Sequence, residues 1–225
     1  MSLVPQEPLE ITLLSLRAQG NGAEIALCVR LEAGGYREQK QLVIATEQYC
    51  EIKPVRGQLS RDAYEAIERA AEIYSAVKRG EGLLSYGANS ARRLTQKLEQ
   101  RGYSREACAA ATSLLVEKGL LDERQDVARE VERCVCKLWG IARIRAHLRQ
   151  KGYSEVEADL LQELLEEVDF VANCAALIQK RYREDLNTPE QTRRAVAALG
   201  RYGYSLQEIK AAIIQVKRSD EADPI

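Results

Sequence analysis

Three similar heptapeptides recur along this chain of 225 residues: Leu98-Glu-Gln-Arg-Gly102-Tyr103-Ser104, Leu148-Arg-Gln-Lys-Gly152-Tyr153-Ser154 and Leu199-Gly-Arg-Tyr-Gly203-Tyr204-Ser205. Their glycines, at positions 102, 152 and 203, are 50 and then 51 residues apart. A fixed period of this size indicates a tandem array, because each unit needs a neighbour to cover its apolar face. The chain is therefore predicted to consist largely of one repeated module.

Each heptapeptide has the pattern of one helix that ends and another that begins. The glycine suits the left-handed position that closes many helices, and the serine suits an N-cap. Glu157 and Glu208 would complete capping boxes in the second and third copies, whereas the first copy has Ala107 there. Hydrophobic staples are expected between Tyr103 and Cys108, Tyr153 and Ala158, and Tyr204 and Ile209. We therefore predict three rigid helix–turn–helix corners, whose glycines and serines bind no ligand.

Apolar periodicity predicts a further helix before each corner, so each repeat is expected to contain three helices. These helices are expected from Arg61 to about Tyr86, from Asp122 to Leu138 and from Val168 to Tyr182. Two glycines, Gly80 and Gly82, are expected to weaken the last turns of the first one. The segment Thr188-Pro-Glu-Gln191 is a start signal for the second helix of the third repeat.

The first sixty residues have a different pattern. Alternating apolar and polar residues in 9–16, 23–31 and 41–45 predict a small antiparallel meander, with a short helical turn near 46–50. The predicted fold is mainly α: tandem three-helix repeats in a curved, elongated array, preceded by a small antiparallel β domain. The expected boundaries are 1–58 for the β domain, 59–120, 121–167 and 168–218 for the repeats, and 219–225 for a flexible tail.

Composition and motifs argue against several classes of protein. Charged residues make up 30% of the chain and aromatic residues 5%, which is typical of thin helical layers rather than of a thick aromatic core. No apolar run reaches the roughly 18 residues of a membrane span, and the N-terminus lacks the pattern of a signal peptide, so a cytoplasmic protein is expected. No phosphate-binding loop or catalytic motif is present, so neither a cofactor nor an enzymatic activity is predicted.

The cysteines and the single histidine offer no metal site in the sequence. Cys134 and Cys136 have the wrong spacing for a zinc knuckle, and the six cysteines are expected to be buried free thiols. His147 aligns with Lys97 when the repeats are superposed, so it is interpreted as a solvated, cation-like residue rather than a catalytic one.

Basic residues concentrate in the helix that precedes each corner. Residues 133–154 contain six bases and no acid, whereas 155–169 contain seven acids and no base. Superposing the three glycines aligns Arg93, Arg143 and Arg194. A repeated basic face of this kind would contact phosphates or acidic protein surfaces, although an ordinary solvated helix face is the alternative. The candidate binding residues are Arg92, Arg93, Lys97, Arg101, Lys137, Arg143, Arg145, Arg149, Lys151, Arg193 and Arg194.

The face is predicted to act mainly by charge complementarity. The sequence shows no acid-free run of aromatic residues on which unpaired bases would stack. Arg143, Arg145 and Arg149 are expected to be exposed, so reversing their charge should leave thermal stability nearly unchanged.

The repeat pattern resembles the RecX family, bacterial regulators of the RecA recombinase. The residues that carry the resemblance are Leu84-Ser85 and Ser90-Ala-Arg-Arg-Leu94 through Leu98 to Gly102-Tyr103, then Gly119-Leu-Leu-Asp122 with Val127-Ala128, and Gly140 through Ile144 and Leu148 to Lys151-Gly152. It covers about residues 61–217, and its central repeat is the most specific. Arg93 stands where the family often has an acid, and Val127 replaces the usual phenylalanine. The first sixty residues resemble an N-terminal extension found in part of the family.

The resemblance implies a non-enzymatic protein that lies along the groove of the RecA–single-stranded-DNA filament. There it would modulate, mainly inhibit, recombinase, ATPase and coprotease activity in homologous recombination, DNA repair and the SOS response. A cytoplasmic monomer without cofactor or membrane contact is expected. Two alternatives remain: a free-standing DNA-binding helical repeat protein and a purely protein-binding scaffold. The acidic segment 155–167 after the second corner disfavours insertion of that helix into a DNA groove.

Overall fold

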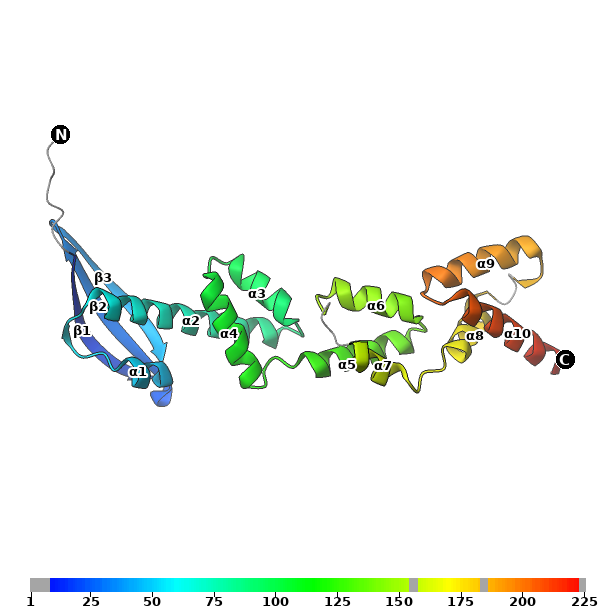
Figure 1. Ribbon diagram of the computed structural model, residues 1–225, viewed down its shortest axis with the longest axis horizontal. Helices are drawn as coiled ribbons and strands as arrows, with labels where there is room; N and C mark the ends of the chain where they lie inside the picture. Colours follow the sequence, from blue (N-terminus) through cyan, green and yellow to red (C-terminus); the bar gives the residue numbers. More distant parts are fainter. Residues whose placement is uncertain (1–8, 154–157, 183–185, 223–225) are drawn as a thin grey trace, which may run out of the picture. The chain divides into compact units, whose positions relative to one another are not determined.

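The computed structural model describes residues 9–153, 158–182 and 186–222, and it is mainly helical with a small N-terminal sheet (Figure 1). The chain divides into two compact units. The first comprises Met1–Ala88 and Leu94–Leu121, and the second comprises Asn89–Arg93 and Asp122–Ile225. The sheet and the first repeat therefore share one compact unit, although the sequence suggested a boundary near residue 58.

The sheet is antiparallel, with the strand order β3-β2-β1-β4. Its strands are β1 (Glu10–Gln19), β2 (Glu24–Ala33), β3 (Tyr36–Ala45) and β4 (Gly57–Gln58). The predicted meander is confirmed, but β3 begins at Tyr36 rather than near residue 41. The first half of β3 is largely polar on both faces, so the sequence shows no alternation of apolar and polar residues there. Its backbone pairing with β2 extends the strand over this half. The helical turn expected near 46–50 is α1 (Thr46–Ile52).

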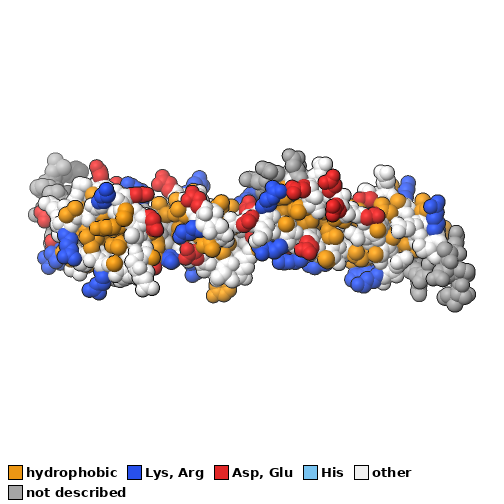
Figure 2. All heavy atoms as spheres, turned by 90° about the horizontal axis from the view of Figure 1, so that it is seen from below, with side chains coloured by type: hydrophobic (Ala, Val, Ile, Leu, Met, Phe, Trp, Pro, Cys, Tyr) orange, Lys and Arg blue, Asp and Glu red, His pale blue; other side chains and the backbone are white. Residues whose placement is uncertain are grey.

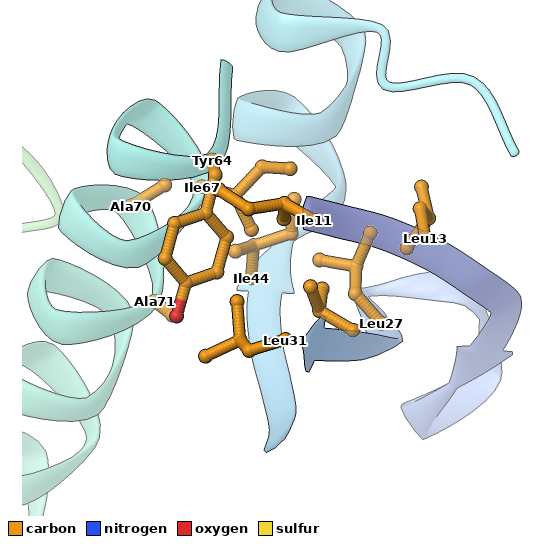
Figure 3. Close-up of a cluster of buried hydrophobic side chains, with 10 residues drawn as sticks. Ile11, Leu13, Leu27, Leu31, Ile44, Tyr64, Ile67, Ala70 and Ala71 are labelled. Atoms are coloured by element: carbon orange, nitrogen blue, oxygen red, sulfur yellow. The ribbon is translucent and has the colours of Figure 1, made fainter. Parts of the chain in front are cut away.

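Helix α2 (Arg61–Ser85) joins the sheet to the first repeat. Its first half packs Tyr64 and Ile67 against sheet residues that include Leu27 and Ile44 (Figure 3). Its second half packs on α4 (Arg105–Glu117). Helix α2 continues through Gly80, which lies where α4 crosses, because a Cβ on Gly80 would meet Leu115.

The three predicted three-helix repeats are confirmed. Repeat 1 contains α2, α3 (Ala91–Glu99) and α4; repeat 2 contains α5 (Glu123–Cys136), α6 (Ile141–Gln150) and α7 (Ala158–Leu165); repeat 3 contains α8 (Phe170–Arg181), α9 (Pro189–Arg201) and α10 (Leu206–Ala222). In each repeat the first and third helices pack together. Helix α10 continues past residue 218, where a tail was expected, because neither glycine nor proline interrupts the sequence before Pro224.

The corners have the predicted backbone conformation. Gly102, Gly152 and Gly203 have φ values of 91°, 91° and 94°. In each corner the glycine N–H donates to the carbonyl three residues earlier, and the next N–H donates to the corner leucine. These hydrogen bonds satisfy carbonyls that the end of a helix would leave free.

The caps that follow the glycines differ between repeats. Ser205 and Glu208 form the predicted capping box, with N···O distances of 2.6 and 3.2 Å. In the first corner, Glu72 of α2 supplies the missing carboxylate and accepts hydrogen bonds from Ser104 N and Oγ at 2.6 and 2.8 Å. Ser154, Glu157 and the side chain of Ala158 lie outside the described residues.

The predicted staples have different outcomes. Tyr204 and Ile209 belong to the same buried cluster, as expected. Tyr103 instead shares a hydrogen bond of 2.9 Å with Ser75 Oγ through its hydroxyl group. Cys108 Sγ lies 3.8 Å from the Tyr103 carbonyl oxygen, and its packing against the Tyr103 ring stays a prediction.

The second and third corners also contact the preceding repeat. Gly140 N donates to Tyr202 O at 2.9 Å, and Ala142 N donates to Gly203 O at 3.2 Å. A Cβ on Gly140 would overlap the Gly203 backbone. The position equivalent to Gly140 in repeat 1 is Ser90, whose hydroxyl donates to Lys151 O at 3.3 Å. The corner is therefore a contact between repeats as well as a turn within one.

This contact predicts that Gly140→Ala lowers the free energy of unfolding by about 1–3 kcal/mol, since the added methyl group has no room. Gly140 has φ −78°, so backbone strain does not contribute. Gly200→Ala is the matched control, because it lies within α9 with nothing near its Cβ, and it should stabilise the protein by about 0.5–1 kcal/mol. Urea denaturation measures both. Equal stability of Gly140→Ala and the wild type would contradict the contact.

Candidate functional site

Four of the predicted basic residues are exposed, and their side chains form no ion pair, hydrogen bond or ring contact with another described residue. Arg145 and Arg149 lie one helical turn apart on α6, while Arg93 is on α3 and Arg193 on α9. On the face drawn in Figure 2, Lys and Arg side chains form short groups with Asp and Glu between them. A continuous basic stripe across all repeats therefore remains a prediction.

Other predicted residues already have partners within the chain. Arg194 forms an ion pair with Glu190 at 2.6 Å, and Arg101 donates to Lys97 O at 2.8 Å. Arg92 is exposed and Lys97 is half-buried. An exposed pair such as Arg194–Glu190 stabilises a helix only slightly and can exchange its carboxylate for an external one.

Glu130 of α5 binds one further candidate, Lys151, together with Arg133 and His147. Its carboxylate contacts Lys151 Nζ at 2.7 Å, Arg133 Nη1 at 2.8 Å and His147 Nε2 at 3.1 Å. Only 7% of its side chain is exposed. Burial acts to raise the pKa of Glu130, but the hydrogen bonds from Lys151 and His147 and the charges of Lys151 and Arg133 outweigh it, so the pKa is below its ordinary value.

This arrangement corrects the interpretation of His147 as a solvated residue. His147 and Lys151 connect α6 to α5 through a buried carboxylate, so His147 has a structural contact, whereas binding of a partner by Lys151 stays a prediction. The sequence contained a signal for the carboxylate. Val127, Val131 and Cys134 define the apolar side of α5, and position 130 falls on that same side at helical spacing.

Arg143 is half-buried rather than exposed. Its guanidinium lies 4.1 Å from the centroid of the Trp139 ring and 4.9 Å from that of the Tyr202 ring. Lys137 Nζ lies 5.4 Å from the Trp139 ring, and Arg181 Nη1 donates to the Tyr202 hydroxyl at 2.8 Å. We call Lys137, Trp139, Arg143, Arg181 and Tyr202 the junction cluster. The sequence shows no aromatic platform because Trp139 and Tyr202 come from different repeats.

The described cysteines bear out the prediction of free thiols, but not their burial throughout. Cys108, Cys134 and Cys174 are buried, whereas Cys28 is half-buried and Cys50 and Cys136 are exposed. Burial raises the pKa of Cys174 to about 12, so this thiol stays protonated and unreactive.

The described residues contain no candidate for a metal site or a membrane-spanning helix. Within this part of the chain, no group of three or more His, Cys, Asp or Glu side chains is placed to hold a metal ion. None of the helices in the same residues is both long and apolar enough to cross a membrane.

Fold and site together define a class: a tandem three-helix repeat protein with an N-terminal antiparallel sheet and basic second helices. No protein-family model matches the chain. Regulatory protein RecX of Halorhodospira halophila (strain DSM 244 / SL1) is 31% identical over 147 residues, which are 63% of this chain and 88% of the relative. Regulatory protein RecX of Xanthomonas campestris pv. campestris (strain B100) is 31% identical over 60% of this chain and 84% of the relative. The chain belongs to the RecX family.

Two solved structures share the fold. A crystal structure of regulatory protein RecX superposes with a TM-score of 0.68 and 20% identity, covering 89% of this chain and 98% of the other. The crystal structure of RecX from Lactobacillus salivarius gives a TM-score of 0.57 and 16% identity, covering 65% and 97%.

The Glu130 contacts predict a pH-dependent stability. Glu130→Gln should lower the free energy of unfolding by about 1–3 kcal/mol at pH 7, because Lys151 and Arg133 lose a buried counter-charge. A carboxyl group whose pKa is lowered on folding stabilises the protein above its unfolded pKa, about 4.3 for Glu, and this stabilisation is lost as the pH falls through the folded pKa. The difference between wild type and variant should therefore be largest above about pH 5 and disappear under more acidic conditions.

Urea unfolding of both proteins from neutral to acidic pH measures this difference. Glu132→Gln is the matched control, since Glu132 is exposed on the same helix. A Glu130→Gln deficit that does not change with pH would show that the charge of Glu130 is not what stabilises the contact.

Proposed function

We propose that this protein is a non-enzymatic regulator of RecA that binds the RecA–single-stranded-DNA filament along its groove. There it restrains recombinase, ATPase and coprotease activity. The observation that carries the proposal is membership of the RecX family, whose relatives are named regulatory proteins. The fold supports it as well, because a repeated module suits a partner that is itself a repeating polymer.

The exposed cations supply the chemistry for such a contact. Arg145 and Arg149 point away from the core of repeat 2, and Arg193 does the same in repeat 3. Each contact with a phosphate or carboxylate would be weak, but contacts that recur along one polymer reinforce each other through effective concentration. Binding of this kind falls as salt rises, since exposed charges are screened.

A groove-reading DNA-binding protein is the less favourable alternative. In a helix–turn–helix protein, the helix after the corner contacts the base edges. Here that helix in repeat 2 is α7, and its exposed described residues include Glu163, Glu166 and Glu167 at and beyond its end. Carboxylates there would repel DNA phosphates.

The proposal predicts that Arg145→Glu/Arg149→Glu weakens binding to the RecA filament by about tenfold or more at low salt, because two attractive contacts become repulsive. The melting temperature should stay nearly unchanged, since both side chains are exposed. Arg143 is left out of this variant because it packs against Trp139 and Tyr202. Lys217→Glu/Arg218→Glu on α10 makes the same change of net charge and should bind almost as well as the wild type.

The assays are RecA ATPase activity and strand exchange on single-stranded DNA, with and without the protein. The wild type should lower both at about one molecule per several RecA protomers. Unchanged RecA activity would contradict the proposal. Binding to free DNA with unchanged RecA activity would favour the DNA-binding alternative instead.

A further inference from the structure

The junction cluster gathers three cations from three different elements of the second compact unit. Lys137 is the C-cap of α5, Arg143 lies in the first turn of α6, and Arg181 ends α8. Their partners among the described residues are aromatic: Lys137 and Arg143 lie over Trp139, Arg143 also lies over Tyr202, and Arg181 donates to the Tyr202 hydroxyl.

These cations lack a carboxylate partner among the described residues. Neighbouring basic residues differ in this respect, because Arg133 and Lys151 share Glu130, and Arg129 pairs with Asp126 at 2.6 Å. The carboxylate of Glu130 already forms hydrogen bonds with Arg133, His147 and Lys151. Within the described chain, the cluster therefore carries positive charge that no internal carboxylate compensates.

The aromatic contacts hold Arg143 in a form suited to an external anion. A guanidinium that stacks on rings uses its faces and leaves its in-plane N–H donors available. No hydrogen bond joins these donors to a described residue. They form a planar fork that matches two oxygens of a phosphate group. A side chain that is already immobilised loses little conformational entropy on binding.

The contact between repeats fixes the rings on both sides of this fork. Gly140 N donates to Tyr202 O at 2.9 Å, and the Tyr204 hydroxyl donates to Leu138 O at 2.9 Å. These two hydrogen bonds hold the backbones next to Trp139 and Tyr202. The rings are therefore positioned by the fold rather than by the ligand.

The cluster occurs at one junction of the array. The positions equivalent to Arg143 are Arg93 and Arg194, and those equivalent to Trp139 are Asn89 and Glu190. In repeat 3 the equivalent arginine pairs with the acid that replaces the tryptophan. The combination of ring, fork and unpaired cations is thus particular to the junction of repeats 2 and 3.

We infer that the junction cluster binds the phosphodiester backbone of single-stranded nucleic acid. The in-plane N–H groups of Arg143 donate to one phosphate, and Lys137 and Arg181 contact neighbouring phosphates. Three cations from three different elements suit a polymer that carries a charge at every unit, as the phosphates of a single strand do. This inference rests on the proposed function and deepens it, because it assigns part of the filament contact to the DNA itself.

The test uses the full chain without RecA and an oligothymidylate of about 30 nucleotides. Trp139 is the only tryptophan of the sequence, so its fluorescence reports on the cluster. It should change as DNA is added. Anisotropy of a labelled oligonucleotide gives the affinity of each variant.

Lys137→Gln/Arg181→Gln should bind about tenfold more weakly than the wild type. The slope of log K against log salt should become shallower by about 1.4, which corresponds to two phosphate contacts. Arg143→Lys should bind several-fold more weakly with an unchanged slope, because it keeps the charge and loses the fork. Lys217→Gln/Arg218→Gln removes two exposed charges from α10 and should bind nearly as the wild type does.

Three results would overturn the inference. These are no change of Trp139 fluorescence, equal affinities of Lys137→Gln/Arg181→Gln and the α10 control, and binding of poly-glutamate with the same dependence on the variants. The RecA assays separate the two proposals. If the variants bind DNA as expected but RecA activity is unchanged, the junction cluster is supported and the RecA role is contradicted. If the protein lowers RecA activity but the variants do not show the expected pattern on DNA, the RecA role is supported and the junction cluster is contradicted.

Discussion

The close backbone contact between Gly140 and the Gly203 corner is the constraint on which repeats 2 and 3 depend. No side chain fits between the two glycines, so the start of α6 can donate hydrogen bonds to the carbonyls of the next corner. The same contact brings Trp139, Arg143 and Tyr202 together. Gly203, which ends α9, thus also sets how repeat 3 packs against repeat 2. The local geometry of the corner therefore affects the surface that the two repeats form together.

Charge on the second helices has two separate uses. On one side of α6, His147 and Lys151 contact the buried carboxylate of Glu130 and so connect α6 to α5. On the other side, Arg145 and Arg149 remain exposed. A buried carboxylate with cationic partners specifies how two helices pair, whereas exposed arginines add little stability and stay available to a partner. Net charge, −1 for the whole chain, conceals this division.

The N-terminal sheet is attached to the array through α2 rather than through a linker. One end of α2 covers the sheet with Tyr64 and Ile67, and the other packs on α4 at Gly80. Glu72 in between caps the first corner by binding Ser104. Repeat 1 has no repeat before it, and α2 provides the polar contact that its corner would otherwise lack. This shared helix explains why sheet and first repeat form one compact unit.

The repeats, their helices, the corners and the existence of a small sheet could all be predicted from the amino-acid sequence. These features follow from periodicity, caps and turns, whose residues interact with close neighbours in the chain. The exposure of each basic residue and the clustering of Trp139, Arg143 and Tyr202 depend instead on tertiary contacts. Such contacts join positions tens of residues apart, and no local pattern encodes them: Arg143 and Arg145 look alike in the sequence, yet one stacks between two rings and the other lies in solvent.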